Sequence, residues 1–126
     1  MNILLILAGV LVLTIGAAHS WLGERYIIVR VLRQMDLPRL FGSDIFTRRT
    51  IRFAWHLTTI AWSGMGSVLL ILSVPPPFSE ARTYILLAVS LTFFMSAVSA
   101  LLITRARHLS WVVFLAISTM VLAALI

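Results

Sequence analysis

The sequence contains no cysteine and no lysine, and each absence excludes a kind of chemistry. Without cysteine the chain forms no disulfide, no thiolate metal site and no iron–sulfur cluster, and it has no thiol nucleophile. Any metal chemistry therefore depends on histidine and carboxylate side chains. Without lysine, the formal net charge of +6 comes from arginine alone, set against only four acidic residues.

Charged residues of both signs are scarce, and apolar residues dominate the chain. Hydrophobic residues make up 61% and charged residues 11% of the 126 residues, and the mean hydropathy is +1.07. An ordinary soluble domain carries roughly 25% charged residues. The composition therefore predicts a single integral membrane domain over residues 1–126, with room for several spans of about 20 residues each.

Four apolar runs predict an all-α fold, a four-transmembrane-helix antiparallel bundle. We expect the helices at about residues 3–34, 48–73, 80–103 and 109–126. The second helix is expected to end at the prolines of VPPPF, because three consecutive prolines cannot continue a helix. Ser79 followed by Glu80 indicates the start of the third helix, and TRARH forms a short basic turn before the fourth.

The arginines are distributed unevenly, which predicts the orientation in the membrane. Seven lie between the first and second apolar runs: Arg25, Arg30, Arg33, Arg39, Arg48, Arg49 and Arg52. Two more lie between the third and fourth, whereas the proline turn is followed by Arg82 alone. The positive-inside rule then places the first and third loops in the cytoplasm and both termini outside. We expect a bacterial inner membrane protein that contacts the lipid bilayer and anionic headgroups, with no nucleic-acid partner.

Three histidines share one expected depth, near the cytoplasmic ends of the first, second and fourth helices. His19 lies on a stripe of glycines at positions 9, 16 and 23, which allows close helix contact, so its ring is expected to face neighbouring helices. Polar residues at steps of four and three mark one face of the second helix, which should also point inward. They are Arg52, His56, Thr59, Ser63 and Gly66. His108 begins a comparable face on the fourth helix.

Each of these features also has a purely structural interpretation. An inward-facing histidine near a helix end is often a hydrogen-bonded packing residue. The tryptophans near the histidines, at positions 21, 55 and 111, are typical interfacial anchors. Glu24 is expected to pair with a nearby arginine, and its alternative roles are metal ligand or proton carrier.

Two kinds of cofactor fit this pattern of histidines and arginines. A pair of histidines on adjacent helices can ligate haem b, while arginines suit its propionates or a quinone carbonyl. The expected cofactor-binding residues are His19, His56, His108, Arg25, Arg52 and Arg107. The three histidines with Glu24 form the alternative metal site, for zinc, copper or iron. So many arginines oppose a bare cation, which favours haem or a quinone, in a redox or sensing role, over transition-metal binding or transport.

The competing functional class is a non-enzymatic accessory subunit of a larger membrane complex. The expected partners are further copies of the chain or the other subunits of such a complex. The sequence has no nucleophile elbow, phosphate loop or His-Glu-x-x-His motif, so whether the chain is an enzyme stays open. The stretches HSWLGER and RFAWHLT resemble those of small uncharacterised four-helix membrane proteins of bacteria. The resemblance spans most of the chain and implies a membrane fold without implying an activity.

Overall fold

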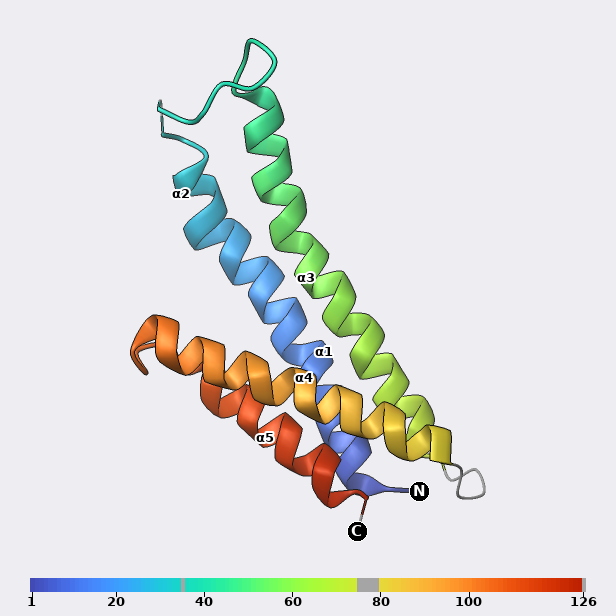
Figure 1. Ribbon diagram of the computed structural model, residues 1–126. Coiled ribbons are helices and arrows are strands. Elements are labelled where there is room, and N and C mark those ends of the chain that lie inside the picture. The colour runs from blue at the N-terminus through green and yellow to red at the C-terminus, as the bar shows by residue number, and fades with distance from the viewer. Residues whose placement is uncertain (35, 75–79, 126) are drawn as a thin grey trace. The chain divides into compact units, whose positions relative to one another are not determined.

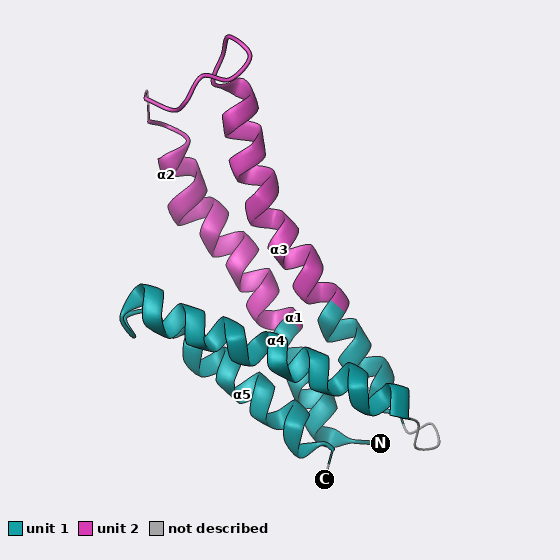
Figure 2. Ribbon diagram, viewed as in Figure 1, with its two compact units in different colours: residues 1–12, 65–126 teal, residues 13–64 magenta. Residues whose placement is uncertain are grey.

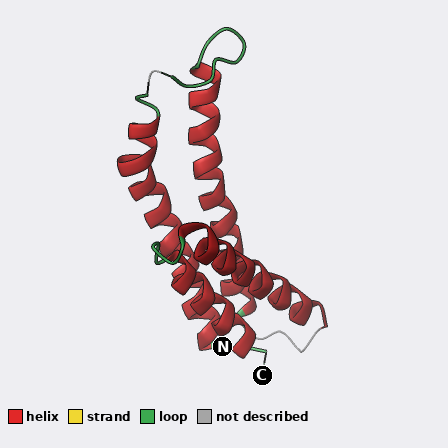
Figure 3. Cartoon of the chain, turned by 60° about the vertical axis from the view of Figure 1, so that its left-hand side comes forward, coloured by secondary structure: helices red, strands yellow, loops and turns green. Residues whose placement is uncertain are grey.

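The computed structural model describes residues 1–34, 36–74 and 80–125, and this part of the chain is all-helical (Figure 1). The first helical rod comprises α1 (Ile3–Gly23), the π-helical turn η1 (Glu24–Ile28) and α2 (Val29–Val31). It is followed by α3 (Ile45–Leu72), α4 (Glu80–Thr104) and α5 (Ser110–Ala123). The expected all-α class with four helices is confirmed. Figure 3 shows helices and loops. In the first loop Leu40 and Ser43 form an isolated antiparallel β-bridge.

Three of the four helices are long and apolar enough to cross a membrane. They are Ile3–Val31, Ile45–Leu72 and Glu80–Thr104. At 1.5 Å per residue even the shortest of them is about 38 Å long, which exceeds a hydrocarbon core of about 30 Å. The fourth, α5, is a shorter apolar helix of 14 residues. Their length and apolar composition are consistent with an integral membrane protein.

The observed helix ends differ from the expected ones for local reasons. α3 begins at Ile45, three residues before the expected position, because Asp44 precedes it and binds Arg48 one turn later. The first rod ends at Val31, ahead of the Leu37–Pro38 step, where the residue before proline disfavours helix. Three expected features fall outside the described residues: Ser79 at the start of α4, the prolines of VPPPF and the final residue of the fourth helix.

The chain divides into two compact units, shown in Figure 2. Unit 1 comprises Met1–Val12 and Met65–Ile126, and unit 2 comprises Leu13–Gly64, so α1 and α3 each run through both. The core of unit 1 contains side chains from all four helices: Leu5, Leu69, Leu86, Phe93, Ile117 and Val121. Within it Ser90 and Ser118 are buried, and each hydroxyl donates to the other's carbonyl oxygen, at 3.1 and 2.9 Å. This exchange satisfies two hydroxyls that burial would otherwise leave without water.

The glycine stripe of α1 packs directly against α3, as the sequence predicts. In unit 1, a Cβ atom added at Gly9 would lie 2.9 Å from the side chain of Leu70. In unit 2, an added Cβ would meet Thr59 and Trp62 at Gly16 and the indole of Trp55 at Gly23. Small residues therefore permit the close approach of the two helices, which is a common form of helix packing in membranes.

Candidate functional site

Unit 2 joins four polar side chains into one hydrogen-bonded chain across α1, η1 and α3. We call this set, Ser20, Glu24, Arg52 and His56, the polar cluster. His56 Nδ1 lies 2.6 Å from Ser20 Oγ, and His56 Nε2 lies 3.3 Å from Glu24 Oε2. The other carboxylate oxygen of Glu24, Oε1, lies 3.0 Å from Arg52 Nη2. The imidazole of His56 therefore links a hydroxyl on one side to a carboxylate–guanidinium pair on the other.

Helical spacing explains why these four residues meet. Ser20 and Glu24 are four residues apart on the first rod, and Arg52 and His56 are four apart on α3, so each pair shares one helix face. In unit 2 the two helices run antiparallel, which sets Ser20 opposite His56 and Glu24 opposite Arg52. Glu24 is also the first residue of η1. Single π-helical turns are rare and are frequent at functional sites.

The polar cluster is partly open to its surroundings. The side chains of Glu24 and His56 are 32% and 35% exposed, and that of Arg52 is 51% exposed. Ion pairs with this much exposure contribute little to folding, typically less than about 1 kcal/mol. The polar cluster therefore contributes little to the stability of unit 2.

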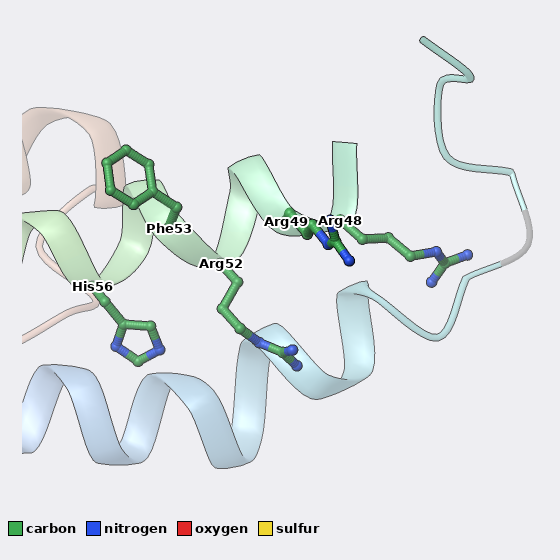
Figure 4. A pocket seen from close by; sticks show the side chains of 5 residues that line it. All are labelled: Arg48, Arg49, Arg52, Phe53 and His56. Atoms are coloured by element: carbon green, nitrogen blue, oxygen red, sulfur yellow. The ribbon is translucent and has the colours of Figure 1, made fainter. Parts of the chain in front are cut away.

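A hollow of about 400 Å³ lies along α3 beside the polar cluster (Figure 4). Its lining residues are Arg48, Arg49, Arg52, Phe53 and His56. In Figure 4 the side chains of Arg52 and His56 extend from α3 towards the neighbouring helix, whereas Phe53 points away from it. The hollow thus combines three cationic groups, an imidazole and an aromatic ring on adjacent faces of one helix.

The charges around the hollow are only partly neutralised. Arg52 pairs with Glu24, and Arg48 pairs with Asp44 at 2.6 Å, whereas Arg49 makes no ion pair with the acidic residues described here. Hydrogen bonds from Arg48 hold the pKa of Asp44 below its ordinary value, and this effect exceeds the opposing effect of desolvation. Asp44 is therefore a carboxylate at neutral pH, and the lining of the hollow keeps a net positive charge.

His19 lies in the same unit as His56 but has different partners. Its ring stacks on Trp55 with centroids 4.4 Å apart and planes within 4°, and Trp62 lies at 5.0 Å. Its Nε2 atom lies 3.0 Å from Thr58 Oγ1, and its carbonyl oxygen accepts a hydrogen bond from Trp55 Nε1 at 3.1 Å. These contacts suit the interpretation of His19 as a packing residue that joins α1 to α3.

The other predicted site residues are not among those that line the hollow. His108, in unit 1, is exposed in the turn before α5, where its Nδ1 atom accepts a hydrogen bond from the backbone N–H of Ser110 at 3.2 Å. Arg107 is exposed in the same turn. Arg25 is exposed on η1, with its guanidinium 5.6 Å from the ring centroid of Tyr26. Of the predicted cofactor-binding residues, Arg52 and His56 therefore line the hollow.

The described residues offer no preformed metal site. Across residues 1–34, 36–74 and 80–125, no group of three or more His, Asp or Glu side chains is placed to hold a metal ion. Both ring nitrogens of His56 already have protein partners. The metal site of three histidines and Glu24 stays a prediction.

The patterns in the sequence did not identify Ser20, Arg48, Arg49 and Phe53 as site residues. A signal for Ser20 was present, because its spacing of four from Glu24 matches the spacing of Arg52 and His56. The expected pairing of Glu24 with an arginine is confirmed, and the partner is Arg52. Comparison of the chain with known protein families, curated proteins and solved structures gives no match. Functional inference therefore starts from the polar cluster and the hollow.

Proposed function

We propose that this membrane protein binds a quinone in the hollow on α3, in a redox or sensing role. The observation that supports this best is the meeting of Arg52 and His56 with the ring of Phe53 in one open hollow. A quinone presents carbonyl oxygens that accept hydrogen bonds, a flat ring and an apolar tail. The guanidinium groups supply N–H donors for the oxygens, His56 holds Glu24 beside Arg52, and the phenyl ring and arginine stems supply apolar surface for the quinone ring.

The surface beyond the hollow suits an apolar tail. Along α3, Phe53, Leu57 and Ile60 are 63%, 46% and 65% exposed. Residues three and four apart lie on one helix face, so these side chains continue one apolar strip away from the arginines. A ligand with an oxygen-bearing head and a hydrocarbon tail fits this polarity.

Haem b has weaker support than a quinone. Axial ligation needs one free ring nitrogen from each histidine. The two nitrogens of His56 are engaged by Ser20 and Glu24, and Nε2 of His19 is engaged by Thr58. Haem ligation by His56 would require its bonds to break, whereas a quinone oxygen can accept from the N–H groups of Arg52 that do not bind Glu24.

An anionic phospholipid offers a similar head and tail, and we propose that anionic headgroups contact Arg49 at the rim of the hollow. We further propose that the protein lies in a bacterial inner membrane, as a homo-oligomer or within a larger complex. The arginine distribution supports cytoplasmic first and third loops and outward-facing termini. The hollow then lies on the cytoplasmic side.

The test is a titration of the purified protein in detergent with a short-tailed quinone. Binding is measured by the quenching of tryptophan fluorescence. Arg52→Gln and His56→Gln should each weaken binding by about tenfold, since a hydrogen bond from a charged donor contributes about 1.5–3 kcal/mol. Arg107→Gln removes the same charge from an exposed turn of unit 1 and should leave the affinity unchanged. A change in tryptophan fluorescence with an anionic phospholipid but not with the quinone would assign the hollow to lipid. No binding of either ligand would favour the accessory-subunit class.

A further inference from the structure

We propose that Ser20, His56 and Glu24 form a proton relay that opens onto the hollow. The imidazole of His56 uses its two nitrogens on two different groups, Nδ1 towards Ser20 and Nε2 towards Glu24. A ring bonded on both sides can accept a proton at one nitrogen and release one from the other. The relay itself is independent of the ligand; only its delivery of protons to a bound quinone rests on the proposed function.

The hydrogen-bonding capacities of the partners fix where the protons lie. An ionised carboxylate only accepts hydrogen bonds, so Nε2 of His56 carries the proton that faces Glu24. In the neutral ring Nδ1 is then the acceptor, and the hydroxyl of Ser20 donates to it across 2.6 Å. In the charged ring Nδ1–H donates to the same hydroxyl, which also accepts. Rotation of one O–H bond therefore satisfies both protonation states without moving either helix.

The transfer conserves protons and moves no electrons. A hydronium ion that reaches the partly exposed hydroxyl of Ser20 gives it a proton and becomes water. At the same time the hydroxyl gives its own proton to Nδ1 of His56, where a new N–H bond forms. The N–H bond at Nε2 then breaks, and the proton forms an O–H bond on Glu24. Glu24 then releases the proton to water, which restores the carboxylate, and a bound quinone takes it instead only after an electron donor has reduced its oxygen. The separation is 3.3 Å at Nε2 against 2.6 Å at Nδ1, so the transfer to Glu24 requires these two groups to approach more closely.

The charged groups around His56 come from both helices of unit 2. Glu24 is the acidic group that faces His56 from the first rod, and Arg52 binds its second oxygen. On α3 itself, Arg48 and Arg49 line the hollow with His56. The guanidinium of Arg52 therefore helps to hold the carboxylate of Glu24 beside Nε2 of His56.

The test uses nitrogen NMR of ligand-free protein that carries labelled histidine, with the His56 signals assigned by their loss in His56→Gln. The relay requires that the neutral ring of the wild type carries its proton on Nε2. In Glu24→Ala the neutral ring should become a mixture of both tautomers, because the carboxylate no longer selects Nε2–H. In the charged ring, Ser20→Ala should lose the protected Nδ1–H signal, and Ser20→Thr should restore it.

Thr58→Ala, which removes a partner of His19 instead, should leave the His56 signals unchanged. A neutral His56 ring that carries its proton on Nδ1 in the wild type would overturn the relay. This measurement needs no variant beyond the one used to assign the signals. Unchanged signals in both Ser20→Ala and Glu24→Ala would overturn it as well. Because the protein is ligand-free, these outcomes do not depend on quinone binding: a correct tautomer without quinone affinity would remove the proposed function alone.

Discussion

Single residues set the distance between α1 and α3, and the contact of Trp55 with Gly23 is the closest of these. The indole of Trp55 occupies the space that a side chain at position 23 would need, and its N–H donates to the carbonyl oxygen of His19. The same indole stacks on the ring of His19. One partly buried tryptophan thus fills a gap, satisfies its polar atom and orients a neighbouring ring, as aromatic residues with a polar end commonly do.

Gly23→Ala should destabilise the protein by about 1–3 kcal/mol, because the added methyl group overpacks the contact with Trp55. Gly64→Ala is the matched control, since an added Cβ at Gly64 meets nothing within 4 Å and removes a helical glycine. Thermal unfolding in detergent should show a lower midpoint for Gly23→Ala and an equal or higher midpoint for Gly64→Ala. Equal midpoints for Gly23→Ala and the wild type would place this face of α1 away from α3.

The sequence alone was informative about which faces carry the site and uninformative about which atoms meet. The glycine stripe and the polar stripe of α3 were predicted, because helical periodicity determines the face of each residue. The partners of His56 depend on the relative axial position of two helices, and a shift of one turn would pair it with different residues. That position is set by contacts such as Trp55 against Gly23, which no single-helix pattern contains.

At the scale of the helices, α3 is the element whose start was least apparent from hydropathy. Residues 45–49 include two arginines and a threonine, so the apolar run begins later than the helix does. The structure shows a helix there because Arg48 binds Asp44 through both its guanidinium and its backbone N–H. An acid at a helix start also interacts favourably with the helix dipole.

The pH dependence of this helix start follows from the lowered pKa of Asp44. A carboxyl group with a depressed pKa contributes stability above its unfolded pKa, about 3.9, and loses it as the pH falls through the lower folded value. The protection of the Arg48 amide against hydrogen exchange, relative to an unfolded peptide at the same pH, should therefore fall in the wild type below about pH 4. Asp44→Asn should show lower protection near neutral pH and little further change on acidification. The same acid-induced loss of protection in both proteins would show that another group is responsible.

The π-helical turn was a second feature that hydropathy did not reveal. The apolar pattern predicted continuous helix through residue 34, and the structure instead has η1 at Glu24–Ile28. A π turn differs from an α turn by one residue in its hydrogen-bond span. This difference leaves no signature in composition, although it alters the direction of the residues around it, including Glu24.

At the scale of the whole molecule, composition predicted a membrane protein and the four apolar runs predicted four helices, because neither depends on the register between helices. Length adds a detail that composition did not. At 14 residues, α5 is about 21 Å long, shorter than the hydrocarbon core, whereas the other three helices exceed it. The predicted position of the C-terminus requires α5 to cross the membrane, and α5 is the helix whose length supports a crossing least.

The orientation can be tested by inserting a reporter at Gly42. This residue adopts a positive φ of 84° in the first loop, and nothing lies within 4 Å of an added Cβ, so an insertion should be tolerated there. A reporter at Gly42 should be active in the cytoplasm, and a reporter after the C-terminus should be active outside. A periplasmic signal from Gly42 would reverse the orientation and place the hollow on the outer side.

The most direct test of the central claim is a double-mutant cycle on quinone affinity with Glu24→Gln and His56→Gln. If the polar cluster acts as one unit, each single change should weaken binding by about tenfold, and the double variant should bind scarcely more weakly than either. The resulting coupling should be about 1 kcal/mol or more, as expected for residues in one hydrogen-bonded network. Additive losses, or single variants that retain wild-type affinity, would contradict the claim that Glu24 and His56 form one ligand-binding site.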